Sequence, residues 1–219
     1  MTKHDGPARL GVGLYSIPDA ARLLKTTVGS VRRWINSSKG VVHSGFGPHE
    51  RTVAFLDLME LHFVKLFRDE GVSLPAIRKA AKTAARQFGA DHPFAIHRFD
   101  TDGCTVFATL ARAEKEAALV EDLKHGQFVF DTIVRPFFKK LEYGQDEAIR
   151  FWPMGMGKRV VLDPARQFGK PIDNETAVPT AALYRAVEVG DDPVLVAKWF
   201  NVPLDAVRAA IVFEKSLAA

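Results

Sequence analysis

The feature that most constrains this sequence is a pair of short amphipathic segments near the N-terminus, separated by a few polar residues. Ser16 is a suitable N-cap for the first segment. The apolar residues that follow recur with helical spacing, at Ile17, Ala20, Ala21 and Leu24. Two helices this short bury their apolar faces by crossing closely, and a residue as small as Ala21 permits that approach. The spacing therefore predicts a helix-turn-helix over residues 14–36.

The second helix of this pair is expected to be basic on its outer face. Thr27 can cap it, and its apolar face consists of Val28, Val31 and Ile35. In helix-turn-helix proteins the second helix enters the major groove, where polar side chains hydrogen-bond base edges and phosphates. We therefore predict DNA contacts from the polar residues of the turn and of this helix, which are Lys25, Thr26, Thr27, Ser30, Arg32 and Arg33.

The segment after the helix pair has the composition of a wing. Residues 37–51 are rich in glycine and basic side chains, and they add Lys39, His43 and Arg51 to the predicted DNA contacts. A helix is expected over Phe55–Glu70, ended by Gly71, and Ser73–Arg78 opens another.

The stretch Ala21–Trp34 resembles the head of the MerR-family regulators, which read Ala-Arg-x-x-Gly-Val-Ser-x-x-Thr-Leu-Arg-Tyr-Tyr. The match needs no gap, although Lys25 stands where the family has its turn glycine. Ser73–Arg78 also matches that family's Gly-x-Ser-Leu-x-x-Ile-Arg stretch. The resemblance implies a winged helix-turn-helix DNA-binding domain over residues 1–90. No sustained heptad follows it, and the single cysteine, Cys104, argues against thiol-based metal sensing.

Residues 91–160 are predicted to form a mixed α/β middle segment that serves dimerisation or partner binding. Asp100–Gly103 is a hairpin signal, so Phe94–Leu110 is expected to contain two short strands around a turn. Two further strands, joined by a glycine-rich loop, are expected at Ile149–Trp152 and Arg159–Leu162. A small mixed sheet is the predicted result.

Residues 190–214 repeat the N-terminal helix pair at a constant offset, which for Ala197 and Ala21 is 197 − 21 = 176 residues. The copy is less basic, because Asp205 and Glu214 accompany its cations. Phosphate neutralisation supplies much of the affinity of DNA-binding proteins, so a charge-balanced helix is a poorer groove reader. DNA contact and protein docking both remain open for this copy. Its candidate contact residues in either case are Lys198, Pro203 and Arg208.

The run from Val160 onward resembles the family catalogued as domain of unknown function 433. The matching residues are Val161–Pro164, Phe168–Pro171, Val178–Thr180, Gly190 and Ala210–Glu214. The resemblance implies a C-terminal helical, helix-turn-helix-like domain over residues 161–219.

A MerR-like head, this middle segment and this C-terminal domain, in that order, resemble the larger multi-domain antitoxins of the VapB type. The resemblance implies a partner toxin of the PIN-like, metal-dependent ribonuclease class. It also implies that a homodimer represses the promoter of the pair by binding its double-stranded DNA. The expected fold class is mainly α with small β elements (α+β).

Composition and motif searches exclude several other classes. The net charge is +4, which permits nucleic-acid binding without requiring it. No apolar run reaches the roughly 20 residues that span a bilayer, and Met1–Arg9 lacks a signal-peptide core. We therefore expect an intracellular protein, and the resemblance to VapB-type antitoxins implies a cytoplasmic, nucleoid-associated protein of bacterial type.

Two features that resemble enzyme motifs lack the residues that those motifs require. Gly155–Lys158 is not a phosphate loop, because Trp152 stands at the required glycine and Arg159 replaces the magnesium-binding hydroxyl residue. His92 and His97 lack the spacing of a metal site. The sequence thus predicts no catalytic residue, metal or cofactor. The alternatives are a protein-interaction adaptor that does not bind DNA, and a MerR-type regulator that responds to a small-molecule ligand.

Overall fold

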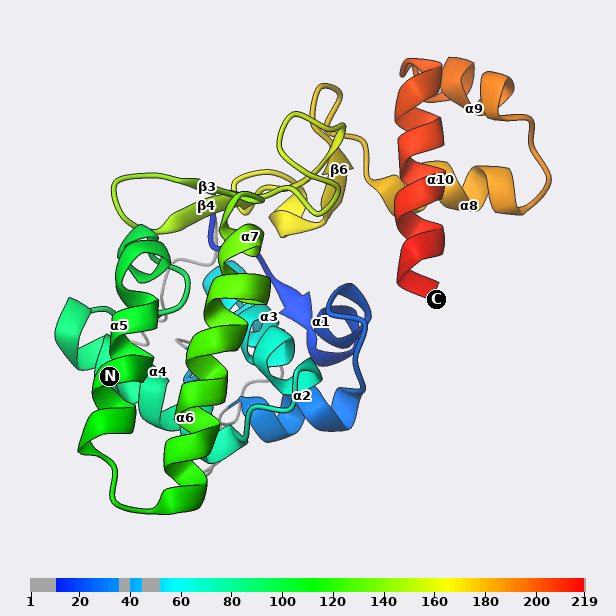
Figure 1. Ribbon diagram of the computed structural model, residues 1–219. Helices are drawn as coiled ribbons and strands as arrows, with labels where there is room; N and C mark the ends of the chain where they lie inside the picture. Colours follow the sequence, from blue (N-terminus) through cyan, green and yellow to red (C-terminus); the bar gives the residue numbers. More distant parts are fainter. Residues whose placement is uncertain (1–10, 36–39, 45–51, 219) are drawn as a thin grey trace, which may run out of the picture.

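The computed structural model describes residues 11–35, 40–44 and 52–218 (Figure 1). The protein is 59% helical and its sheets are small and antiparallel, which confirms the predicted mainly helical α+β fold class. The α-helices are α1 (Ile17–Leu23), α2 (Val28–Trp34), α3 (Phe55–Asp69), α4 (Leu74–Phe88), α5 (His97–Ala113), α6 (Ala117–Val129), α7 (Arg135–Phe138), α8 (Thr180–Glu188), α9 (Pro193–Trp199) and α10 (Leu204–Ala218). A π-helical turn, η1 (Phe130–Val134), joins α6 to α7, and a 3-10 turn, η2 (Gln167–Gly169), precedes the last strand.

The strands form two sheets. They are β1 (Tyr15–Ser16), β2 (Thr52–Val53), β3 (Leu141–Tyr143), β4 (Ala148–Phe151), β5 (Val160–Leu162) and β6 (Pro171–Asp173). β1 pairs with β2, and the other four follow one another in the order β3-β4-β5-β6. The strands expected around residues 149–152 and 159–162 are confirmed as β4 and β5. The expectation of a mixed sheet is wrong, because every neighbouring pair is antiparallel.

The two helices predicted after the wing are confirmed as α3 and α4. Gly71 adopts the left-handed conformation (φ 86°) directly after α3, which ends that helix as expected. Ser73 caps α4, since its Oγ accepts a hydrogen bond from the backbone N–H of Ala76 at 3.3 Å. The local signals of capping and termination were therefore sufficient to place this helix pair.

The hairpin predicted over Phe94–Leu110 is wrong, because α5 runs straight through its supposed turn. Gly103 is needed for packing rather than for turning: a Cβ built there would lie 2.5 Å from the Phe130 ring. Gly126 on α6 is in the same situation and would clash with the ring of Phe107 at 2.6 Å. These two glycine–phenylalanine contacts let α5 and α6 lie close together as a helical hairpin.

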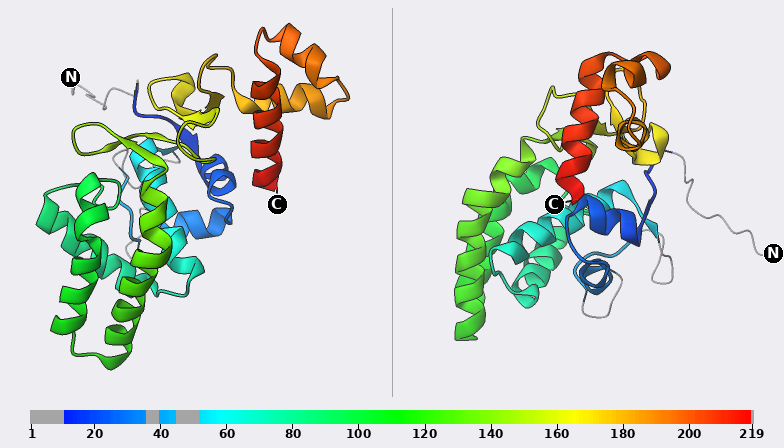
Figure 2. Two further views of the ribbon diagram at one scale, coloured as in Figure 1. Left: turned by 45° about the horizontal axis from the view of Figure 1, so that its top comes forward. Right: turned by 90° about the vertical axis from the view of Figure 1, so that its right-hand side faces the viewer.

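The apolar core has two main parts. One continuous cluster extends from Tyr15 through α2–α6 to Leu162, whereas α8–α10 pack around their own cluster, which includes Leu183 and Val207. In Figures 1 and 2, α8–α10 form a separate lobe beside the main body, and the C-terminal end of α10 points toward α1. The proposed domain limits at residues 90 and 160 remain predictions.

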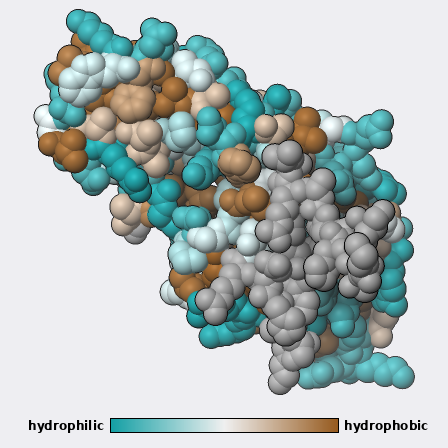
Figure 3. All heavy atoms as spheres, turned by 180° about the vertical axis from the view of Figure 1, so that it is seen from behind, coloured by the Kyte–Doolittle hydropathy of each residue, from teal (hydrophilic) through white to brown (hydrophobic). Residues whose placement is uncertain are grey.

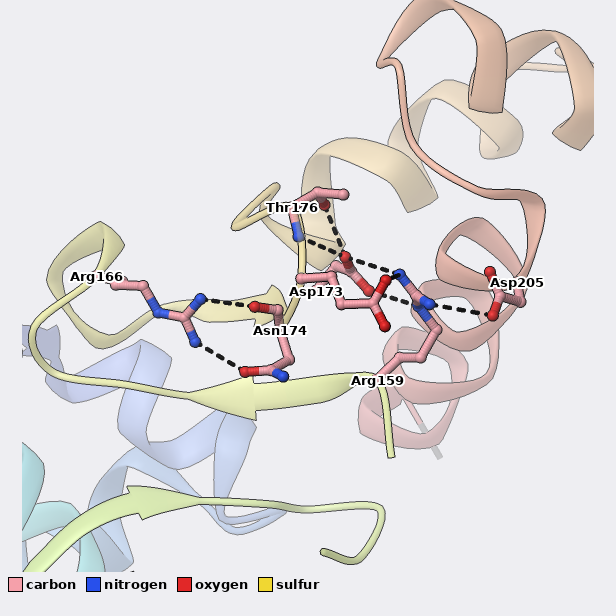
Figure 4. Close-up of polar contacts among 7 residues, drawn as sticks. Arg159, Arg166, Asp173, Asn174, Thr176 and Asp205 are labelled. Atoms are coloured by element: carbon pink, nitrogen blue, oxygen red, sulfur yellow. Dashed lines mark hydrogen bonds and ion pairs between the residues drawn. The ribbon is translucent and has the colours of Figure 1, made fainter. Parts of the chain in front are cut away.

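A polar network connects the β5–β6 hairpin to the C-terminal lobe (Figure 4). Arg159 donates to both carboxylate oxygens of buried Asp173, at 2.7 and 3.1 Å, and reaches Asp205 of α10 at 3.1 Å. Arg166 makes two hydrogen bonds to Asn174 across the hairpin, at 2.7 and 3.0 Å. Burial alone would raise the pKa of Asp173, but hydrogen bonds from Arg159 and its neighbours lower it. The hairpin is thus fixed by charged hydrogen bonds as well as by strand pairing.

The same region is also attached to the start of the N-terminal helix pair. The Tyr15 hydroxyl donates to the carbonyl of Gly169 at 2.7 Å, and the Leu14 N–H donates to the carbonyl of Phe168 at 2.9 Å. A Cβ at position 169 would lie 2.4 Å from the Tyr15 oxygen, so only glycine fits there. Burial raises the pKa of Tyr15 above its usual value, and Asp163 adds to the effect.

Candidate nucleic-acid interface

The predicted pair of short helices is confirmed as α1 and α2. Ser16 caps α1 by accepting from the Asp19 N–H at 3.2 Å, and Thr27 caps α2 by accepting from the Ser30 N–H at 3.0 Å. Between the helices, Lys25 adopts a left-handed conformation (φ 51°). Lys25 therefore supplies the left-handed residue of this turn, although it is not a glycine.

The two faces of this helix pair are clearly divided. The residues toward the core are Ala20, Ala21, Leu24, Val31, Trp34 and Ile35, all buried. The side chains of Lys25, Thr27, Arg32 and Arg33 are exposed, and those of Thr26 and Ser30 are half-buried. The structure thus brings six of the predicted contact residues together on α2 and the turn before it.

The outer surface of α2 is positively charged. Its first turn contains no acidic residue, and Arg32 and Arg33 lie in its last turn. Ser30 Oγ accepts from the Thr27 hydroxyl at 3.0 Å, which leaves the Ser30 hydroxyl proton available for another acceptor. Arginine guanidinium groups and hydroxyl donors are the groups that bind phosphates and base edges.

The predicted wing lies largely outside the described residues, and so do Lys39 and Arg51. His43 is described and its side chain is exposed. The described ends of this segment are held to the helix pair: Val41 N–H donates to the Trp34 carbonyl at 2.8 Å, and β2 pairs with β1. Arg78 on α4 also donates to the carbonyl of Gly40 at 3.1 Å.

The neighbouring helix α3 contains a buried acid, Glu60. Its Oε1 accepts from the N–H groups of Phe94 and Ala95, at 2.5 and 3.2 Å. Burial raises the pKa of Glu60 to about 8, against the lowering effect of these two hydrogen bonds. The acid is therefore largely protonated in the folded protein near neutral pH.

Sequence reasoning missed the contact between α1 and the C-terminal lobe. Arg22 Nη1 lies 2.7 Å from Oε2 of buried Glu214, and Oε1 of the same carboxylate accepts from the Thr180 hydroxyl at 2.5 Å. Arg22 and Glu214 are 192 residues apart, so no local pattern could pair them. This ion pair joins α1 to α10 and α8.

The second helix pair has the same backbone as the first. Asn201 adopts the left-handed conformation (φ 50°), as Lys25 does. Asn201 N–H donates to the Lys198 carbonyl at 3.2 Å, and Val202 N–H to that of Ala197 at 2.9 Å. The first turn has the equivalent bonds, from Lys25 N–H to the Arg22 carbonyl and from Thr26 N–H to that of Ala21, at 3.0 and 2.9 Å.

The outer surface of the second pair is different. The predicted contact residues Lys198, Pro203 and Arg208 are all exposed. The same helix pair also exposes apolar side chains: Leu195 and Trp199, one turn apart on α9, are 41% and 60% exposed. Val194 and Phe200 are exposed beside them. Figure 3 shows apolar residues gathered on this lobe.

Within the described residues, no group of three His, Cys, Asp or Glu side chains is placed to hold a metal ion. Among the same residues, no helix is both long and apolar enough to cross a membrane.

Comparison with known proteins identifies a curated relative and a solved structure with a similar fold. No protein-family model matches the chain, so the resemblances to MerR regulators and to domain of unknown function 433 remain predictions. The chain is 25% identical to "Putative antitoxin VapB45" of Mycobacterium tuberculosis, over 93% of this chain and 94% of that protein. The crystal structure of Rv2018 from Mycobacterium tuberculosis has the same fold, with a TM-score of 0.75 and 24% identity over 93% of this chain and 99% of that one.

Proposed function

We propose that this protein is an antitoxin that binds the DNA of its own promoter through α1–α2 and neutralises a PIN-like, metal-dependent ribonuclease. The nearly full-length similarity to a protein named as an antitoxin supports the general role. The observation that carries the DNA-binding part is the exposure of Arg32 and Arg33 on a capped helix whose first turn lacks acids.

The charge on α2 suits the polyanionic surface of DNA. A helix of this size enters the major groove of B-DNA, and its exposed arginines then lie near base edges or phosphates. Lys25, Thr27 and Ser30 lie at the N-terminal end of α2, which is the end that reaches the bases in helix-turn-helix proteins. Paired half-sites mirror a two-fold symmetric protein, so a homodimer is the expected DNA-binding form.

The second helix pair is the proposed surface for the toxin. Exposed apolar side chains that share one helix face are typical of protein contact sites, and aromatic residues such as Trp199 often dominate their affinity. Asp205 is engaged with Arg159, and this acid at the start of α10 would repel phosphate. We therefore assign Lys198, Pro203 and Arg208 to a protein interface rather than to DNA.

In this proposal the protein is non-enzymatic. It acts by occupying DNA and by covering the ribonuclease, which places it in the cytoplasm at the nucleoid. No cofactor is required for either role.

Binding to the DNA upstream of its own gene, titrated across salt against a scrambled competitor, tests the proposal. We expect specific binding that weakens steeply as salt rises, because neutralised phosphates release counterions. If the protein shows no specific binding, either alone or with the product of the neighbouring gene, a protein-interaction adaptor becomes the better description. The apolar face of α9 already fits that second function.

A further inference from the structure

A cavity of about 260 Å³ lies between the N-terminal helix pair and the end of α10. Its wall is formed by the end of α1 and the turn after it, by α3 and by the last turns of α10, together with Lys140 and single residues of α7, β4 and β5. Residues 153 and 154 of the β4–β5 loop also reach it. All of these segments belong to the described residues, and none of their roles above requires an open space there.

The wall of this cavity combines two kinds of side chain. Its apolar part includes Leu58 and Met59 of α3, Phe151 of β4 and Phe213 of α10, which are buried. Every charged residue that the structure places in the wall is a lysine, as the next paragraph describes. An apolar cavity with a few convergent polar groups is the usual form of a small-molecule site.

The lysines in the wall are Lys25, Lys65 and Lys140. Lys65 pairs with Asp69, whereas Lys25 and Lys140 make no ion pair with any described residue. Two lysine charges without acidic partners, beside an apolar wall, favour a ligand that carries a compensating negative charge.

His62 adds a neutral polar group to the wall. Its ring stacks on Phe137 with centroids 4.1 Å apart and meets Phe151 edge-on. Burial, together with the nearby charges of Lys65 and Lys140, lowers the pKa of His62 to about 3. The imidazole is therefore uncharged near neutral pH and can donate or accept one hydrogen bond without adding charge.

We propose that this cavity binds a small amphipathic carboxylate. The head lies at Lys25 and Lys140, and the apolar body lies against Leu58 and Phe213. The volume is just below the roughly 300–1,000 Å³ of sites for drug-sized ligands, so the ligand is a short-chain or single-ring acid. The bound acid would touch both the turn of the first helix pair and the end of α10. This inference concerns ligand binding alone and does not depend on DNA binding.

Isothermal titration of the full chain with sodium octanoate tests the site, with octanamide as the neutral analogue of the same length. We expect octanoate to bind with a dissociation constant below about 1 mM and octanamide at least about 10-fold more weakly. Hexanoate and 3-phenylpropanoate extend the series. If none of the three acids binds, or if octanamide binds as well as octanoate, the inference is wrong.

Substitutions locate the binding site. Lys140→Met should weaken octanoate binding by about 10- to 100-fold, as loss of a charged hydrogen bond does. Lys140→Arg should retain it, which separates loss of charge from loss of fold. Lys139→Met is the matched control, because Lys139 is exposed and lies outside the cavity wall. Equal affinities of the Lys140→Met and Lys139→Met variants would place the ligand elsewhere and overturn the assignment.

Discussion

The helix pair α1–α2 and the helix pair α9–α10 differ in what they present to solvent, although their backbones match. In each pair the turn contains a non-glycine residue in the left-handed region, Lys25 in one and Asn201 in the other. Both turns close with the same backbone hydrogen bonds, 176 residues apart. The first pair exposes arginines, whereas the second exposes Leu195 and Trp199.

This difference shows that two helix pairs with matching turns can expose different side chains to solvent. The caps, the turn and the small residue at the crossing specify the shape, whereas the side chains on the outer faces of the two helices differ between the pairs: arginines on α2, and Leu195 and Trp199 on α9. Asp205, in the first turn of α10, has no acidic counterpart in the first turn of α2. We therefore assign DNA to the first pair and protein to the second, and the predictions below test that division.

The largest expected effect is on the affinity of the second helix pair, α9–α10, for its proposed protein partner. Trp199→Asp should lower the affinity for the proposed toxin partner by several hundred-fold, about 3.5 kcal/mol, because a central aromatic contact becomes a charge. Isothermal titration calorimetry measures this loss of affinity. Phe128→Asp is the control, since Phe128 is also an exposed aromatic residue (64%) but lies on α6. If both variants bind the ribonuclease normally, α9 is not the contact surface.

The pH dependence of stability should differ between the core cluster that contains α3 and the cluster formed by α8–α10. The unfolded chain loses the Glu60 proton near pH 4.5 and the folded chain near pH 8, so the folded state is favoured below this range and loses stability as pH rises through it. The loss should reach about 3 kcal/mol, and Glu60→Gln should abolish it. Hydrogen exchange followed from pH 5 to 8 should show the change in α3–α5 rather than in α8–α10. Glu121→Gln, an exposed substitution on α6, should keep the wild-type pH dependence.

The ion pair that joins α1 to α10 can be broken by replacing Arg22. Arg22→Ala leaves the buried Glu214 carboxylate without its cation and should lower the free energy of unfolding by about 2 kcal/mol, moderated by the partial exposure of Arg22. Adding Glu214→Gln should restore part of that loss. Lys198→Ala changes the equivalent position of the second pair, which is exposed, and should have little effect. Chemical denaturation measures all four proteins, and equal stability of the Arg22 and Lys198 variants would show that the ion pair adds nothing.

The smallest expected effect concerns the turns. A left-handed conformation costs an ordinary side chain roughly 1 kcal/mol, and asparagine tolerates it better than lysine. Lys25→Gly should therefore raise the free energy of unfolding by about 0.5 kcal/mol, and Asn201→Gly should leave it nearly unchanged. Thermal unfolding compares the two. A larger gain at Asn201 would mean that the turns are less alike than their backbones indicate.

Local signals in the sequence were enough to predict the helix pairs, because caps such as Ser16 and Thr27 and the apolar spacing act within a few residues. They were misleading at Gly103, where a turn signal lies inside α5 because the Phe130 ring requires a glycine. The division of the core into two main clusters also depends on contacts between distant residues.

The sequence predicted those parts of the candidate interface that depend on local patterns, and missed those that depend on distant contacts. Its exposed basic residues on α2 follow from helical periodicity, which places Arg32 opposite the buried Val31 and Trp34. The ion pair between Arg22 and Glu214 spans most of the chain and leaves no local pattern. The exposure of Trp199 was also unpredictable, because periodicity alone does not say which apolar residues remain without a neighbour.

The central claim, that DNA binds the first helix pair and not the second, is tested most directly by one titration of promoter DNA with two register-matched variants. Arg32 and Arg208 are equivalent positions, and both are exposed. Arg32→Ala should weaken specific binding by about 1–3 kcal/mol, or reduce the salt slope by about one if it contacts a phosphate. Arg208→Ala should bind promoter DNA like the unchanged protein. Weaker DNA binding by the Arg208 variant, with normal binding by the Arg32 variant, would contradict the assignment.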